Sequence, residues 1–196
     1  ARDGGKARAL SIDFADPLAA KDSFAGAGFD ILVNNAGIIR RADSVEFSEL
    51  DWDEAMDVNL KALFFTTQAF AKELLANGRP GKVVNIASLL SFQGGIRVPS
   101  YTAAKHGVAG LTKLLANEWA AKGINVNAIA PGYIETNNTE ALRADAARNK
   151  AILERIPAGR WGHSDDIAGA AVFLASPAAD YVHGAILNVD GGWLAR

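Results

Sequence analysis

Short aliphatic runs recur along the chain and alternate with longer segments whose apolar positions repeat every three to four residues. The short runs have the length and β-branched content of strands, and the longer segments have the period of amphipathic helices. Consecutive apolar residues, as in Ile31–Val33, are typical of strands that helices cover on both faces. The pattern therefore predicts an α/β fold built on a parallel sheet. The expected strands are Ala9–Ile12, Ile31–Val33, Val83–Ala87, Val126–Ile129 and Ile186–Val189.

Three of the longer segments carry clear start or stop signals for helices. One helix is expected over Leu50–Asn77, where Asn77 and the following glycine form a C-terminal stop. A second begins at Ser100, a suitable N-cap, and ends at Gly123. A third runs over Ser164–Leu174, with acidic residues at the positive end of its dipole. The chain shows no repeat, low-complexity tract or linker, so we expect a single domain over residues 1–196.

Composition narrows the classes of function. A chain of 196 residues that is 49% hydrophobic and 21% charged, with a net charge of -2, is typical of one water-soluble globular domain. The 20 basic and 22 acidic residues form no like-charge run, which argues against nucleic acid as a partner. Zero cysteines exclude disulfides, thiolate metal sites and a cysteine nucleophile, and they favour a reducing compartment such as the cytoplasm. No segment reaches the roughly 20 apolar residues of a membrane span or resembles a secretion signal, so no membrane association is expected.

A candidate acid/base pair lies near the start of the second expected helix. Tyr101 and Lys105 are four residues apart, so their side chains project from one helix face. A phenol has an unperturbed pKa of about 10, and a nearby cation lowers that pKa toward a working pH. Ser88 follows an expected strand, at the place where open parallel sheets bind ligands. Taken singly, the pair also fits an exposed helix, and the serine also fits a turn.

The combination of these residues resembles the short-chain dehydrogenase/reductase family, in which Ser, Tyr and Lys follow this order and spacing. Ser88 lies thirteen residues before Tyr101, and the similarity extends over nearly the whole chain. The resemblance implies a three-layer, doubly wound, Rossmann-like sheet. Further matches to the family pattern are Asn34-Asn35-Ala36-Gly37, Asn59 between Val58 and Leu60, Pro131-Gly132, and Asp190-Gly191-Gly192.

The resemblance assigns a role to each catalytic position. Tyr101 would exchange a proton with the substrate oxygen, and Ser88 would form a hydrogen bond to that oxygen. Lys105 would lower the Tyr101 pKa and bind the nicotinamide ribose, and Asn59 would hold a water in the proton relay. The reaction would interconvert a secondary alcohol and a ketone by hydride transfer with a nicotinamide, without a metal. Without the other motifs, Asn59 fits equally a helix amide bonded to nearby backbone.

The cofactor positions are carried over in the same way. Asn34, Ala36 and Gly37 would support the sheet and run beside the cofactor. Asp13 and Phe14 would lie near the adenine, although Asp13 fits a turn or cap equally well. One further stretch would meet the nicotinamide carboxamide and lead into the substrate lid; it contains Pro131, Gly132, Ile134 and Thr136. A plain break between a strand and a loop explains the Pro-Gly pair equally well.

The glycine-rich phosphate turn of the family has no counterpart in this chain. The Gly26-Ala27-Gly28 stretch precedes a strand and lacks the third glycine that opens a helix, so a turn is expected there. Because the chain also starts at Ala1 without Met, we expect it to be part of a longer protein. The residues that select NAD or NADP would lie in the missing segment.

Several stretches outside the catalytic pattern resemble one group within the family, the 2-deoxy-D-gluconate 3-dehydrogenases and 2-dehydro-3-deoxy-D-gluconate 5-dehydrogenases. The group implies NAD(H) as cofactor, with NADP left open, a keto or hydroxy sugar acid as substrate, and a homotetramer. Small residues on the second helix, Gly107, Ala109 and Gly110, would permit close helix contact with a neighbouring subunit. The matching stretches are Gly37–Arg41, Ser91–Tyr101, Thr136–Thr139, Arg155–Gly162 and Gly191–Arg196.

An acidic substrate needs a cationic anchor. Arg97 lies four residues before Tyr101 and would bind the carboxylate with two hydrogen bonds, although a surface ion pair fits it as well. Gln93 would bind a substrate hydroxyl, as would Asn137 and Asn138 of the lid. The weaker candidates for the anchor are Arg143 and Arg160.

Two other readings stay open. Within the enzyme class, the chain fits a 3-oxoacyl carrier-protein reductase or another sugar or polyol dehydrogenase, and an apolar pocket would favour the acyl substrate. In a different class, it would be an inactive fragment or a binding scaffold that lacks the phosphate loop. The complete set of Asn59, Ser88, Tyr101 and Lys105 argues against a long-standing loss of the chemistry.

Overall fold

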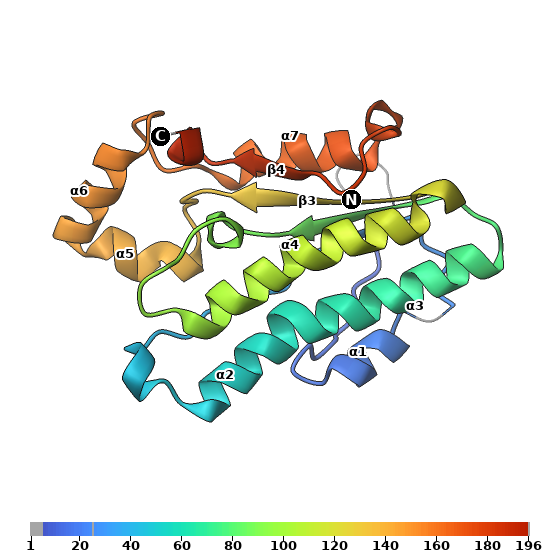
Figure 1. The fold of residues 1–196 in the computed structure, drawn as a ribbon, viewed down its shortest axis with the longest axis horizontal. Helices are drawn as coiled ribbons and strands as arrows, with labels where there is room; N and C mark the ends of the chain where they lie inside the picture. Colours follow the sequence, from blue (N-terminus) through green and yellow to red (C-terminus); the bar gives the residue numbers. More distant parts are fainter. Residues whose placement is uncertain (1–5, 25, 196) are drawn as a thin grey trace.

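A four-stranded parallel sheet forms the centre of the molecule (Figure 1). The computed structural model describes residues 6–24 and 26–195, so Ala1 and Arg196 lie outside the described residues. The strands are adjacent in chain order, and four of the five expected strands are confirmed. They are β1 (Ile31–Asn34), β2 (Gly81–Ile86), β3 (Ile124–Pro131) and β4 (Ile186–Val189).

Helices cover both faces of this sheet and give three layers, as the α/β prediction required. The long helices α3 and α4 pack on one face, whereas α7 contacts β2, β3 and β4 from the other (Figure 1). Helix α1 packs against α3. The α-helices are α1 (Pro17–Asp22), α2 (Glu49–Met56), α3 (Ala62–Ala76), α4 (Pro99–Trp119), α5 (Glu140–Ala144), α6 (Ala146–Arg155) and α7 (Ser164–Ala175). Short turns of helix are η1 (Ser44–Glu46), η2 (Asp57–Lys61), η3 (Leu89–Ser91), η4 (Ala120–Lys122), η5 (Asn137–Thr139), η6 (Pro177–Ala179) and η7 (Trp193–Ala195).

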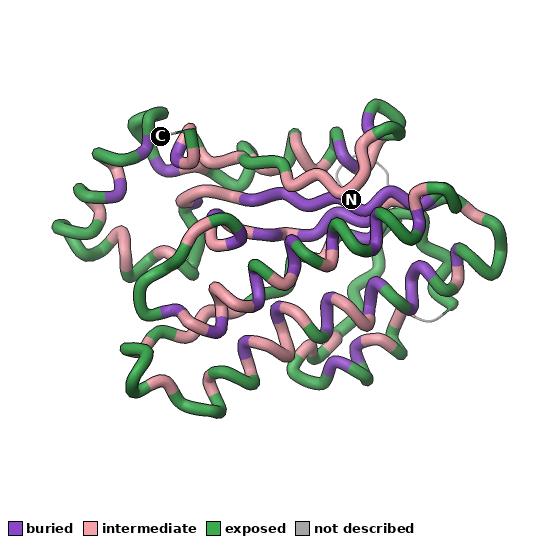
Figure 2. Tube along the Cα trace, viewed as in Figure 1, coloured by how far each residue is buried: buried purple, intermediate pink, exposed green. Residues whose placement is uncertain are grey.

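The alternation of side chains along β2 shows why its apolar run is continuous. Val83 packs in a cluster with Leu74 of α3, whereas Val84 packs in a second cluster with Leu174 of α7. Successive strand residues point to opposite faces, so a strand between two helix layers needs apolar residues at consecutive positions. The buried stretches in Figure 2 follow the central strands for this reason.

The structure corrects two of the strand predictions. Ala9–Ile12 forms no strand, because no described strand lies beside it to accept and donate backbone hydrogen bonds. The run Ile31–Val33 is a strand, but it is not covered on both faces by the described residues. Leu32 is buried, whereas Ile31 and Val33 of the edge strand β1 are about half exposed, at 48% and 47%.

The helix predictions hold with one correction at a cap. The expected helix over Leu50–Asn77 appears as α2, the π-helical segment η2 and α3, without a break between them. The second helix begins at Pro99 after Val98, so Ser100 is a buried first-turn residue and not the N-cap. Proline is favoured in the first turn because its missing N–H needs no partner there. Gly123 ends this helical stretch in the left-handed conformation, with φ of 82°.

Parallel strands bring their carboxyl ends to one edge of the sheet, and the loops that follow them meet there. Residues after Asn34, Ile86, Pro131 and Val189 therefore surround one region. Among the described residues, no helix has the length and apolar character to cross a membrane.

Candidate active site

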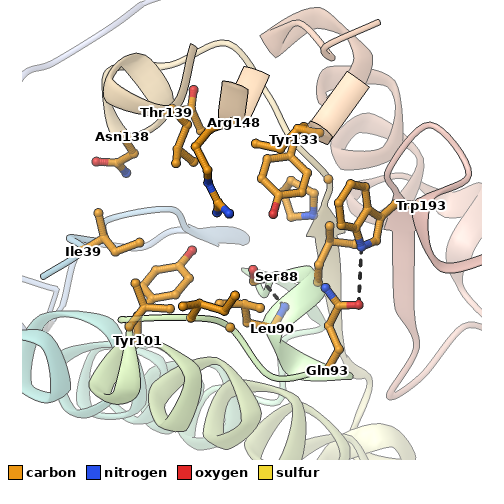
Figure 3. A pocket seen from close by; sticks show the side chains of 18 of the residues that line it. Ile39, Ser88, Leu90, Gln93, Tyr101, Tyr133, Asn138, Thr139, Arg148 and Trp193 are labelled. Atoms are coloured by element: carbon orange, nitrogen blue, oxygen red, sulfur yellow. Dashed lines mark hydrogen bonds between the residues drawn. The ribbon is translucent and has the colours of Figure 1, made fainter. Parts of the chain in front are cut away.

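Two adjoining cavities open at the carboxyl edge of the sheet. The first, of about 390 Å³, lies beneath the lid formed by η5, α5 and α6, and Figure 3 shows the side chains that line it. The second, of about 450 Å³, lies between the ends of the strands and the start of α7. Ser88 and Tyr101 line both cavities, so they stand where a molecule in one would meet a molecule in the other.

Ser88 is held at this boundary by the turn η3, which follows β2. Its Oγ accepts a hydrogen bond from the backbone N–H of Leu90 at 3.2 Å. A further hydrogen bond joins the Ser88 side chain to Tyr101 and lowers the pKa of the phenol. Because the Leu90 N–H occupies one acceptor position of the hydroxyl, Ser88 keeps its own proton for the bond to the Tyr101 oxygen, at the boundary of the two cavities.

Tyr101 and Lys105 lie together as their spacing predicted, but the electrostatics differ from the expectation. Burial is the largest influence on Tyr101 and raises its pKa, and the groups that oppose this rise are Ser88 and Arg41. Lys105 is almost fully buried, which lowers its pKa to about 8. Its Nζ lies over the Tyr101 ring, 5.5 Å from the ring centre. Ser88 and Arg41 are the groups that lower the Tyr101 pKa here, and a lowering by Lys105 remains a prediction.

Asn59 joins the π-helical segment to the loop after β1. Its Oδ1 accepts from the backbone N–H of Ile38, and its Nδ2 donates to the Ile38 carbonyl oxygen, both at 2.9 Å. A Cβ on Gly37 would lie 2.9 Å from the same Oδ1, so the approach requires glycine. Asn59 thus forms hydrogen bonds to backbone, which agrees with the alternative to the relay role. The backbone belongs to a loop distant in sequence and not to the neighbouring helix. The role of Asn59 in a water relay remains a prediction.

The residues expected to bind the cofactor fall into three groups. Gly37, Pro131, Gly132, Ile134 and Thr136 line the second cavity together with Ser88, Tyr101 and Lys105. Asn34 instead supports the sheet, because its Nδ2 donates to Thr67 and Asn85 at 2.8 Å each. The third group lines neither cavity and consists of Ala36, Asp13 and Phe14. The Asp13 carboxylate accepts a hydrogen bond from the Ala15 N–H within a turn.

The proposed substrate anchor lies outside the first cavity. Arg97 is 59% exposed at its side chain and pairs with Asp43 at 3.0 Å. Its φ of 65° places it in the left-handed region, which is uncommon for a residue other than glycine. Gln93 does line the cavity, where its Oε1 accepts from the Trp193 indole at 3.4 Å.

The other polar candidates separate in the same way. Asn138 of the lid lines both cavities, whereas Asn137 lines neither. Arg160 forms two hydrogen bonds to Asp166, at 2.7 and 2.9 Å, and Arg143 donates to the Thr136 carbonyl oxygen. Neither arginine lines the cavities that Ser88 and Tyr101 share.

Sequence reasoning missed the cations that do line the first cavity. Arg41 comes from the loop after β1, and Arg148 and Arg155 come from the lid helix α6. No acidic side chain lines this cavity among the described residues. Tyr133 lies between Trp161 and Trp193 and completes the wall of the cavity. Burial raises the pKa of Tyr133, and all three arginines act against that rise. The position of Arg41 after a strand was a usable signal, and Arg155 opens a matching stretch, whereas no local pattern marked Arg148.

A family model described as Enoyl-(Acyl carrier protein) reductase matches residues 2–194. The chain belongs to the short-chain dehydrogenase/reductase family. A curated relative, 2-dehydro-3-deoxy-D-gluconate 5-dehydrogenase of Escherichia coli (strain K12), is 66% identical over 167 residues. The match covers 85% of this chain and 66% of the relative, so the chain spans about two thirds of that protein's length.

Solved members of the short-chain dehydrogenase/reductase family share the fold closely. A protein of Agrobacterium tumefaciens with bound NADP, provisionally assigned as a 2-deoxy-d-gluconate 3-dehydrogenase, is 94% identical with a TM-score of 0.97. That match covers 100% of this chain and 79% of the solved one. A gluconate 5-dehydrogenase from Burkholderia cenocepacia J2315, in complex with NADP and tartrate, is 43% identical with a TM-score of 0.89. The second match covers 94% of this chain and 74% of the other.

The second cavity fits the nicotinamide end of such a cofactor. The Lys105 ammonium has three donors, and among the described residues it bonds to the Ile86 carbonyl oxygen at 2.6 Å. The remaining donors, with the hydroxyls of Thr136 and Ser164 that line the cavity, suit ribose hydroxyls and a carboxamide. That Lys105 and Tyr101 hold the ribose remains a prediction.

Proposed function

We propose that the protein interconverts a secondary alcohol and a ketone on a keto-deoxy sugar acid, with a nicotinamide dinucleotide as cofactor. The observation that carries the proposal is that Ser88 and Tyr101 line both cavities. A substrate beneath the lid and a nicotinamide in the second cavity would therefore meet at these two hydroxyls. When bound, the nicotinamide supplies the hydride.

The side chains of the site divide the remaining work. In ketone reduction, the Tyr101 phenol donates its proton to the carbonyl oxygen, and the Ser88 hydroxyl donates a hydrogen bond to that oxygen. The raised pKa of Tyr101 suits this direction, because it keeps the phenol protonated at neutral pH. In alcohol oxidation the same phenol, ionised, accepts the proton. Asn59 holds the loop carrying Gly37 against the cavity that would receive the cofactor.

The charge of the first cavity supports an acid as the substrate. Arg41, Arg148 and Arg155 line it without an acidic side chain among the described residues, which favours a carboxylate over a neutral sugar. A 3-oxoacyl chain would leave three guanidinium groups facing hydrocarbon, so the acyl carrier-protein reductase is the less suited alternative. The names of the sugar-acid dehydrogenases among the relatives support the same substrate class.

For the cofactor, the relatives favour NADP(H) over the NAD(H) that the resemblance implied. Three solved relatives hold NADP. We therefore propose that the protein prefers NADP(H). Steady-state kinetics with NADPH and NADH under the same conditions test the preference. A higher kcat/KM with NADH would return the assignment to NAD(H).

The activity itself is tested by assaying the intact protein with 2-dehydro-3-deoxy-D-gluconate and its oxidised counterpart. Cofactor absorbance should change only when a sugar acid is present. A 3-oxoacyl thioester serves as the competing substrate. If it gives the higher kcat/KM, the acyl assignment replaces this one, and if no substrate gives turnover while NADPH still binds, the protein is a binding scaffold.

A homotetramer and a cytoplasmic location are further proposals. The helical surface of α2 to α4 supports association, but the small residues contribute less than expected. Gly107 faces Leu60 of the same chain, where a Cβ would lie 2.9 Å from a leucine methyl, and Ala109 is buried. Leu114 is 47% exposed and Gly110 is open, so they remain for a partner. Light scattering of the intact protein should give the mass of four subunits, and a monomer at micromolar concentration contradicts the proposal.

A further inference from the structure

The three arginines of the first cavity differ in whether the protein already uses them. Arg41 donates to the Asn138 carbonyl oxygen at 3.0 Å. Arg155 donates to Gln93 Oε1 at 3.5 Å and stacks on the Trp193 ring at 4.0 Å. The Arg148 guanidinium forms no hydrogen bond or ion pair with any residue that the structure describes. It is therefore the one of the three whose full set of donors is available to a ligand.

The Arg148 side chain points into the cavity. Figure 3 shows it reaching down from the lid toward the side where Ser88, Tyr101 and the Tyr133 hydroxyl lie. It comes from the first turn of α6, whose start is fixed by the Asp145 carboxylate. That carboxylate accepts from the Arg148 N–H at 3.0 Å.

The backbone around Arg148 is held in place by its neighbours on α6. Asn149 accepts a hydrogen bond from the Trp161 indole at 2.8 Å. One turn further along, Ile152 is buried in a cluster with Leu89 and Trp193. Such support positions a binding group before the ligand arrives, so less conformational freedom is lost on binding.

We propose that Arg148 binds the substrate carboxylate and is the residue by which the enzyme selects a sugar acid over a neutral sugar. The inference rests on the proposed function and names the residue that sets its substrate class. A guanidinium donates two parallel N–H hydrogen bonds to the oxygens of a carboxylate, and no described acid competes for them in this cavity. Because α6 carries Arg148, binding of the carboxylate also holds the lid over the reacting carbon.

The test compares an acid with its neutral analogue in the intact enzyme. Arg148→Ala should lower kcat/KM for 2-dehydro-3-deoxy-D-gluconate roughly thirty- to a thousandfold, mainly through KM, because two charge-assisted hydrogen bonds are lost. For the analogue in which the carboxylate is reduced to an alcohol, kcat/KM should change less than about threefold. Arg148→Lys should recover part of the loss, since it restores the charge without the bidentate geometry.

Lys150→Ala is the matched control. Lys150 lies on the same helix, is exposed and pairs with Glu154, so this variant removes a cation of α6 that does not line the cavity. Both substrates should keep kcat/KM within about twofold. If Arg148→Ala lowers kcat/KM for the acid and for the neutral analogue by the same factor, Arg148 is a structural residue of the lid and the proposal is wrong. The proposal is also overturned if the acid is unaffected.

A binding measurement separates this proposal from the proposed function. Calorimetry with NADP present compares gluconate with sorbitol, a neutral polyol of similar size. Wild-type protein should bind gluconate the more tightly, and Arg148→Ala should lose that difference. If this holds although no substrate is turned over, the proposed function fails and the carboxylate site stands. Equal binding of the two probes by the wild type overturns the site.

Discussion

The Lys105 ammonium lies over the face of the Tyr101 ring, 5.5 Å from the ring centre, and donates to the Ile86 carbonyl oxygen. The four-residue spacing brings the two side chains to one face of α4, but burial acts on them in opposite directions. It raises the pKa of Tyr101 and lowers the pKa of Lys105 to about 8. Burial favours the neutral form of each group, so both shifts have one cause.

Tyr101→Phe should lower kcat at least about a hundredfold, because it removes the proton donor from the boundary of the two cavities. The change leaves the ring over Lys105, so the fold should be kept, as circular dichroism and thermal unfolding would show. Near-normal turnover by this variant would contradict the assignment of Tyr101 as the acid/base.

Arg41→Ala should raise the pKa of Tyr101, because the Arg41 charge is one of the two influences that lower it. In alcohol oxidation the phenolate accepts the proton, so the rising limb of kcat/KM against pH should move to higher pH. Arg41→Lys, which keeps a positive charge, should leave the limb nearer to its wild-type position. An unchanged limb in Arg41→Ala would show that the charge does not act on Tyr101.

Lys105 should make the stability of the protein depend on alkaline pH. Its pKa is 10.5 when unfolded and about 8 when folded, so between these values the unfolded state binds more protons and stability rises with pH. Below about pH 8 the cost of burying the ammonium is present in full. The free energy of unfolding of Lys105→Met minus that of wild type should fall across this window by on the order of 3 kcal/mol. A difference that stays constant from pH 7 to 10.5, measured by urea denaturation, would show that burial does not shift the Lys105 pKa.

Arg97→Ala should leave kcat/KM for the acid within about twofold of wild type, because the residue pairs with Asp43 at the surface. Alanine keeps a Cβ at this left-handed position, so the backbone energy changes little. Kinetics with the acid and the neutral analogue check this result. A loss confined to the acid would restore Arg97 as the anchor.

Local patterns in the sequence were enough to predict most of the elements and the catalytic positions. The apolar runs at β2 and β3 report burial between two helix layers, which depends on each strand's own residues. Likewise, the placement of Lys105 beside Tyr101 follows from the geometry of a single helix. Ser88 was predictable because the carboxyl ends of parallel strands always meet at one edge.

The tertiary structure decided the features that depend on contacts between distant segments. Ala9–Ile12 has the composition of a strand but no described neighbour to pair with, and Ile31 and Val33 are exposed because β1 is an edge strand. The positive charge of the substrate cavity also depends on contacts between distant segments. Arg97 is closest in sequence to Tyr101, yet it is exposed and pairs with Asp43 outside the cavity. Arg148, 47 residues after Tyr101, faces the catalytic pair because α6 folds back over the cavity, a direction that side-chain packing sets.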